Sequence, residues 1–158
     1  MALLGPVGPP PGVSRGARES TNPGAQTLLH VIGVAQIARI GETEITLVSL
    51  EMYTDSFIAN FRFQGSPPNP SQPGQPDRGH MLLFNAEAFD DLGNGYQGQP
   101  RGGGGNWQKW RLSAYFTPAH PMGARILKFT VPEVNWMARG PGLRSAIEPG
   151  PWEFQVEL

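Results

Sequence analysis

The stretch that decides the fold reads Phe-Ile-Ala-Asn-Phe-Arg-Phe, from Phe57 to Phe63. Successive side chains of an extended strand point to opposite faces, so residues two apart share a face. One face carries Phe57, Ala59, Phe61 and Phe63, and the other carries Ser56, Ile58, Asn60, Arg62 and Gln64. This alternation is typical of a half-buried strand. The stretch therefore predicts a strand with one face in an apolar core and the other in solvent.

Similar segments recur along the chain, separated by breaks rich in Gly and Pro. With residues 56–64, the predicted strands are 28–38, 43–53, 80–89, 107–116, 125–131 and 151–158, with 134–136 as a continuation of the sixth. Thr54-Asp55 is typical of a hairpin turn, Gly33 predicts a break, and a change of apolar phase predicts a bulge near Leu47. About seven short strands without a helical period predict an all-β fold, an antiparallel immunoglobulin-like β-sandwich. A closed barrel is the alternative.

The composition narrows the classes of function. The chain has 158 residues, enough for one domain with its own core. Charged residues make up 16% and the formal net charge is −1, so we expect no nucleic acid partner and no binding to an anionic membrane surface. The absence of Cys excludes disulfides, thiol catalysis and zinc–thiolate sites. No apolar run approaches the roughly 20 residues of a membrane-spanning helix, so no membrane insertion is predicted.

The N-terminal segment differs in composition from the rest of the chain. Residues 1–26 are rich in Pro and Gly and include the run Pro9, Pro10 and Pro11. Such a segment buries too little apolar surface to offset the entropy of ordering it. We predict a flexible arm with local polyproline character over 1–26 and one sandwich domain over 27–158. The N-terminus lacks the basic start and apolar run of a signal peptide, so we expect synthesis in the cytosol and leave the final compartment open.

Two further breaks lie inside the predicted sandwich. Residues 65–79 hold several prolines and show no periodicity, and loops of this length are usually functional or disordered. The run Gly102–Gly105 invites a comparison with phosphate-binding loops, but it lacks the Lys-Ser/Thr ending and the following helix that those loops require. We therefore predict a flexible hairpin loop at Gly102–Gly105.

One acidic turn is a candidate metal site. Asp90, Asp91 and Asn94 offer oxygen ligands of the kind that calcium prefers. Their spacing does not fit an EF-hand loop, and Asp, Asn and Gly are also the ordinary residues of tight turns. The interpretation we favour is a turn, with no metal and no cofactor.

Aromatic residues suggest a second kind of site, because their ring faces stack on the apolar faces of sugars. Trp110 and Trp152 are in phase with core residues and are assigned to packing. Trp107 and Trp136 border predicted loops, and with Tyr96 they form a candidate carbohydrate site. No His or Ser of the chain has a base or ligand at the spacing that catalytic or zinc sites use, so we predict no catalytic residue.

Several of these segments together carry a resemblance. The chain resembles a loose group of bacterial immunoglobulin-like domains of unassigned function over residues 28–131. The segments that match are Ile45–Tyr53, Phe57–Phe63, Asp90–Tyr96, Tyr115–Pro118 and Arg125–Val131. The resemblance implies a non-enzymatic sandwich of the kind appended to envelope proteins or regulators, and it transfers no catalytic residue.

The sequence therefore favours a structural or interaction protein over an enzyme. Exposed sheet edges offer unpaired backbone groups that bind extended segments. We expect a protein partner, in particular a homo-oligomer, bound through sheet edges and through the arm at Pro9, Pro10 and Pro11. The alternative is a carbohydrate- or other ligand-binding module that uses Tyr96, Trp107 and Trp136.

Overall fold

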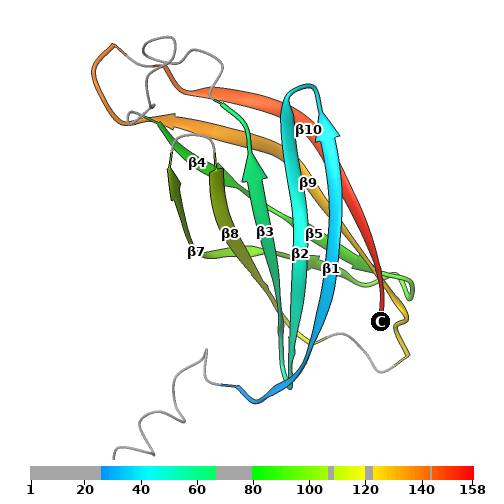
Figure 1. The fold of residues 1–158 in the computed structure, drawn as a ribbon. Helices are drawn as coiled ribbons and strands as arrows, with labels where there is room; N and C mark the ends of the chain where they lie inside the picture. The colour runs from blue at the N-terminus through cyan, green and yellow to red at the C-terminus, as the bar shows by residue number, and fades with distance from the viewer. Residues whose placement is uncertain (1–25, 67–79, 107–108, 120–122, 143) are drawn as a thin grey trace, which may run out of the picture.

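The computed structural model describes residues 26–66, 80–106, 109–119, 123–142 and 144–158. Within them the chain forms ten strands and no helix, arranged as two antiparallel sheets packed face to face (Figure 1). The predicted all-β sandwich is therefore confirmed. No helix of the described residues has the length and apolarity needed to span a membrane.

Each sheet has a simple strand order. The first sheet runs β1 (Leu28–Ile40), β2 (Thr43–Tyr53), β3 (Phe57–Gln64), β8 (Lys109–Phe116) and β7 (Gln99–Asn106). The second runs β10 (Ala146–Glu157), β9 (Ile126–Ala138), β5 (Glu87–Asp90) and β6 (Gly95–Gln97), and β4 (His80–Phe84) pairs with the far half of β9. β3 is thus the centre of the first sheet, and β9 is the strand on which most of the second sheet depends.

The core forms where the inner faces of β3 and β9 meet. Phe57, Ala59, Phe61 and Phe63 are all buried, while Arg62 and Gln64 are exposed. The ring of Phe57 stacks on that of Phe116 with 4.9 Å between centroids, and the ring of Phe61 meets that of Phe84 edge to face at 5.4 Å. The strand predicted from the Phe57–Phe63 alternation is confirmed in type and in phase, but Ile58 on the predicted solvent face is buried as well.

Backbone irregularities lie close to the predicted places. The pairing of β2 with β3 shifts between Leu47 and Ser49, which confirms the bulge expected near Leu47. The pairing of β1 with β2 shifts between Gly33 and Gln36, and Ala35 has a φ of 54°. An Ala rarely adopts this left-handed conformation, so the bulge of β1 is held by contacts made elsewhere.

The strand count was predicted too low. The segment 80–89 divides into β4 and β5, and β6 and β7 were not predicted as strands. The prediction of a flexible loop at Gly102–Gly105 was wrong, because these residues lie within β7, where Gly103, Gly104 and Gly105 pair with β8. A Cβ added at Gly103 would lie 2.5 Å from Leu112 Cδ2 and 2.8 Å from the carbonyl oxygen of Arg111. The glycines therefore permit a close approach of two strands, a contact that no local pattern in the sequence reveals.

Candidate functional site

The acidic turn is built around Asp90. Its Oδ1 accepts the backbone N–H groups of Leu92 and Asn94, each at 2.9 Å, and its Oδ2 accepts Asn94 Nδ2 at 2.8 Å and Tyr96 Oη at 2.9 Å. Burial raises the pKa of the Asp90 carboxyl, but the hydrogen bonds from Asn94, Tyr96 and Leu92 outweigh it and lower the pKa overall. Both carboxylate oxygens therefore close the β5–β6 hairpin.

Asp91 anchors the same hairpin to the start of β9. Its Oδ1 accepts the backbone N–H groups of Arg125 at 2.9 Å and Ile126 at 3.3 Å. The hydrogen bond from Arg125 is the main cause of a lowered pKa of the Asp91 carboxyl. Among the residues that the structure describes, no group of three His, Asp or Glu side chains lies close enough together to hold a metal ion. Asp90, Asp91 and Asn94 thus make up a hydrogen-bonded turn.

The candidate carbohydrate-binding residues that the structure describes are buried. Tyr96 is 5% exposed and Trp136 is 1% exposed. The indole N–H of Trp136 donates to Glu148 Oε1 at 3.1 Å, and Glu148 Oε2 accepts Thr43 Oγ1 at 2.6 Å. Trp136, a candidate for the carbohydrate site because it borders a predicted loop, is buried because its position on β9 faces the core, where Glu148 joins it to β2. Trp107 and the run Pro9, Pro10 and Pro11 lie outside the described residues.

One edge of the first sheet is long and apolar. β1 spans 13 residues and, among the described residues, pairs only with β2. Its outward side chains include Leu29, Val31 and Ile37, which are 59%, 55% and 62% exposed. Natural sheet edges are usually protected by charges, prolines or short length. The only charged residue within β1 is Arg39, and it forms an ion pair with Glu44.

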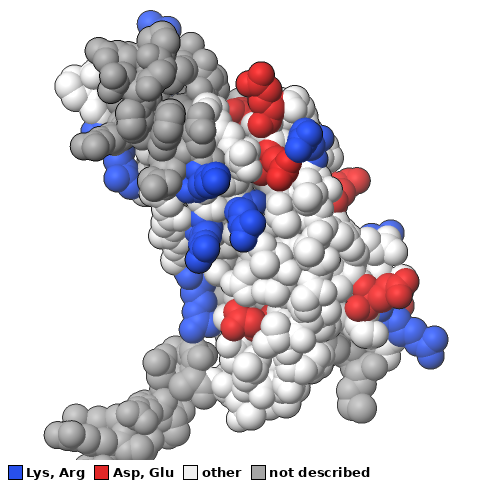
Figure 2. All heavy atoms as spheres, in the orientation of Figure 1, with Lys and Arg blue, Asp and Glu red and all other residues white. Residues whose placement is uncertain are grey.

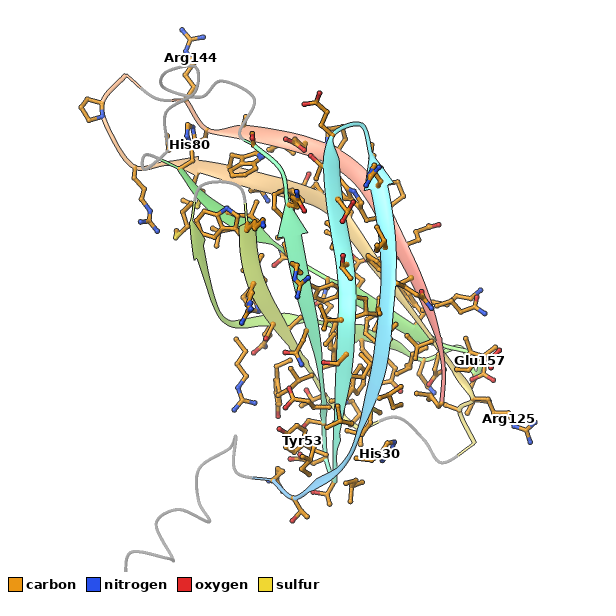
Figure 3. The ribbon with its side chains drawn as sticks, viewed as in Figure 1. His30, Tyr53, His80, Arg125, Arg144 and Glu157 are labelled. Atoms are coloured by element: carbon orange, nitrogen blue, oxygen red, sulfur yellow. The ribbon has the colours of Figure 1, made fainter. Side chains whose placement is uncertain are left out.

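The two halves of β1 have different surroundings. Near Gln36 the strand approaches β10, and the side-chain amide of Gln36 hydrogen-bonds to the backbone of Gln155. Residues 28–31 lie beyond this contact, and all four are exposed. Figure 3 shows His30 and Tyr53 at this end of the sandwich, opposite the end that holds His80 and Arg144. We call residues 28–33 the open half of β1.

A second surface feature lies on the outer face of the same sheet. Figure 2 shows basic side chains in a column over β3, β8 and β7. Beneath them is a groove of about 600 Å³, lined by Arg62, Gln64, Gly104, Gly105, Lys109, Trp110 and Arg111. We call this the basic groove. Among the described residues that line it, none is acidic.

Strand pairing, rather than sequence proximity, brings these residues together. Arg62 of β3 lies directly opposite Arg111 of β8, and Gln64 lies opposite Lys109. Lys109 and Arg111 are two apart on one strand, so their outward orientation followed from the predicted phase of 107–116. The position of Arg62 beside them depended on which strands are neighbours. Sequence reasoning therefore missed this site.

The comparisons with known proteins identify only a fold. The sequence matches no known family, and no curated protein matches it. The fold is similar to that of the conserved domain protein from Bacillus anthracis, with a TM-score of 0.61 and 18% identity, over 82% of this chain and 48% of that one. The chain thus spans about half of the length of that protein. A DUF4426 family protein from Pseudomonas aeruginosa gives a TM-score of 0.40 at 15% identity, over 78% of this chain and 96% of that one.

Proposed function

We propose that the chain is a non-catalytic structural or interaction protein in which the open half of β1 pairs with the same segment of a second copy. Its sandwich is of the bacterial immunoglobulin-like type that the sequence resembles, and the N-terminal arm lies along the neighbouring copy. The observation that carries the proposal is the exposure of residues 28–31 on an edge strand of 13 residues.

The apolar surface of this edge favours burial against a partner. Leu28, Leu29 and Val31 are each about half exposed, and they follow one another on a strand whose outer side has no partner among the described residues. Burying apolar area yields roughly 25 cal/mol per Å². An added strand would cover these side chains and would also satisfy the backbone N–H and C=O groups of the edge.

The charge of the edge favours a second copy as that partner. Between Leu28 and Ala38 the chain has no Asp, Glu, Lys or Arg. Two identical strands that pair across a two-fold axis place like residues near each other, and a charged edge would repel its own copy. This edge carries no such penalty.

The predicted arm leads directly into the open half of β1. Residues 1–26 join the sandwich at Thr27, whose carbonyl oxygen accepts the backbone N–H of Thr54 at 3.2 Å. Two copies paired through β1 would therefore hold both arms close to the interface. Prolines reduce the entropy that an extended segment loses on binding.

The alternative function, a carbohydrate-binding module, loses support from the burial of its residues. Stacking on a sugar requires an accessible ring face, and Tyr96 and Trp136 are both buried. The edge-pairing proposal needs no such exposure and uses residues that the structure places at the surface.

Sedimentation equilibrium of the full chain over a wide range of concentration tests the proposal. We expect a reversible dimer for the wild type and a monomer for Val31→Lys, because the variant places a charge on the edge. Val31 lies opposite Glu51 on β2, so a Lys there has an acidic neighbour and the fold should be retained.

Leu92→Lys is the matched control. Leu92 is as exposed as Val31 but belongs to the turn after β5, so this variant should associate like the wild type. A wild type that stays monomeric at every concentration would contradict edge pairing. Equal weakening by both Lys variants would point to general repulsion instead.

A further inference from the structure

We infer that the basic groove binds a tetrahedral oxyanion, of the phosphate or sulfate class, between Arg62 and Arg111. The inference is independent of edge pairing, because the groove lies over β3, β8 and β7, toward the edge of the sheet opposite β1. Three features of the groove lead to this ligand: a pair of arginines with no ion-pair partner among the described residues, a neighbouring row of polar side chains and a bare floor.

The first feature is the arrangement of the two arginines. Arg62 and Arg111 are a directly opposed cross-strand pair, and adjacent strands are only about 4.8 Å apart. Guanidinium groups stay charged at every accessible pH, so the pair repels itself permanently. In the same row, the next residues outward are Thr46 on β2 and Gly104 on β7, and neither can neutralise the pair. A dianion between the two forks would convert the repulsion into charge-assisted hydrogen bonds.

The nearest carboxylates of the outer face are held elsewhere. Glu44 lies beside Gln64 in the next row, but it forms an ion pair with Arg39 on the side of β1. Glu51 accepts Asn60 Nδ2 at 3.0 Å and Tyr53 Oη at 3.3 Å. Within the described residues, the ion pair of Arg39 with Glu44 is the only one found. The acidic groups that the structure describes near the groove are therefore engaged away from its cations.

The second feature is the row that follows the arginines toward the end of β8. Gln64 and Lys109 are directly opposed there, so an amide and an ammonium group border the groove. Lys109 brings a third positive charge on a long flexible stem. A ligand seated on the arginines could accept hydrogen bonds from the Lys109 ammonium and the Gln64 amide N–H groups on this side.

The third feature is the floor of the groove. Gly104 pairs with Arg111, and a Cβ built at Gly104 would meet no atom within 4 Å. The outer face of β7 is therefore bare beside the arginines, because a strand of glycines projects no side chains. This absence of side chains creates the hollow, and it lets a ligand approach the sheet backbone.

Calorimetric titration of the full-length protein with pyrophosphate, at low ionic strength, tests the inference. We expect saturable binding with one site, and at least tenfold weaker binding for Arg62→Gln and for Arg111→Gln. Both arginines point to solvent, and their replacement removes repulsion, so these variants should melt at the wild-type temperature or above it.

Lys128→Gln is the control. It changes the net charge by the same amount as Arg111→Gln but lies exposed on β9 in the other sheet, so its affinity should stay within twofold of the wild type. An equal loss in Lys128→Gln would show that only net charge matters and would overturn the site. A wild type without saturable binding would overturn it as well.

Three further titrations and one spectrum identify the class of ligand and its place. Inorganic phosphate and sulfate should compete with pyrophosphate, whereas binding of citrate alone would contradict a tetrahedral oxyanion. In ¹⁵N-labelled protein, the backbone amide resonances of Gly104 and Arg111 should shift on addition of pyrophosphate. Shifts confined to amides outside the groove would place the ligand elsewhere and reject the groove.

Discussion

The side-chain amide of Gln36 makes two hydrogen bonds to the backbone of Gln155, as a neighbouring strand would. Its Nε2 donates to the carbonyl oxygen of Gln155, and its Oε1 accepts the backbone N–H of the same residue at 3.0 Å. β1 and β10 are edge strands of different sheets, so this amide joins the two sheets where their edges meet. The bulge at Ala35 precedes Gln36 directly. The contact divides β1 into a half that β10 approaches and the open half proposed for pairing.

Replacing Gln36 by Ala should therefore loosen the edge of β10. The variant loses two exposed hydrogen bonds, and we expect a loss of about 1–2 kcal/mol in the free energy of unfolding. Urea denaturation measures it, and the amide of Gln155 should exchange its hydrogen faster. Gln97→Ala, at an exposed position of β6, should change stability by less than about 0.5 kcal/mol. Unchanged exchange at Gln155 would show that the contact does not hold the edge.

The alternation in β3 predicts unequal costs for two neighbouring residues. Phe61 is buried among Phe84, Phe129 and Phe154, so Phe61→Ala should cost about 3–5 kcal/mol. Arg62 points to solvent, so Arg62→Ala should cost less than about 0.5 kcal/mol. Chemical denaturation of both variants gives the comparison. Similar losses would contradict the register of β3.

Substitution by Ala should also have unequal effects on stability at two glycines of β7. A methyl group at Gly103 would collide with Leu112 and with the backbone of Arg111, whereas one at Gly104 would enter open space. We expect Gly103→Ala to lower the free energy of unfolding by about 1–3 kcal/mol and Gly104→Ala to leave it nearly unchanged. Thermal melts of the two variants decide between this account and a flexible loop, in which both substitutions would be tolerated.

The pair of Tyr96 with Asp90 predicts a loss of stability in alkali. Burial, the hydrogen bond to Asp90 and the charge of Asp90 raise the pKa of Tyr96 from 10.0 to about 12. Because the folded pKa lies above the unfolded one, the neutral phenol stabilises the fold fully below about pH 10, and this contribution is lost as the pH rises toward 12. The difference in stability between the wild type and Tyr96→Phe should therefore shrink over that range. Parallel pH profiles of the two proteins would contradict the raised pKa.

Deletion of residues 1–26 should leave the sandwich folded. The core lies between the two sheets and begins with strand residues after Thr27, so the 27–158 chain should keep its β-type circular dichroism and melt cooperatively. If the arm assists association, the full chain should form a larger species than the truncated chain at equal concentration, and salt should affect it little. An unfolded truncated chain would show that the boundary is misplaced.

The sequence by itself determined the strands whose pattern is local. The alternation of Phe57, Ala59, Phe61 and Phe63 predicted both a strand and its buried face, because strand phase depends only on neighbours along the chain. The bulge near Leu47 and the turn at Thr54-Asp55 were predictable for the same reason, and Tyr53 N–H donates to the carbonyl oxygen of Ser56 at 2.9 Å across that turn. The acidic turn at Asp90 likewise followed from its own residues.

Only the tertiary structure decided which strands are neighbours and which residues they bring together. A run of glycines has no periodicity, and Gly102–Gly105 became a strand because β8 offered a close-packed backbone partner. Trp136 borders a predicted loop in the sequence, yet it is buried because β9 continues between β10 and β4 and the ring packs on Phe63 of the other sheet. The basic groove depends on the placement of Arg62 beside Arg111. Strands far apart in the sequence pair so that whole apolar faces are buried. Which faces are buried together depends on the assembled sheets and cannot be predicted from any one segment.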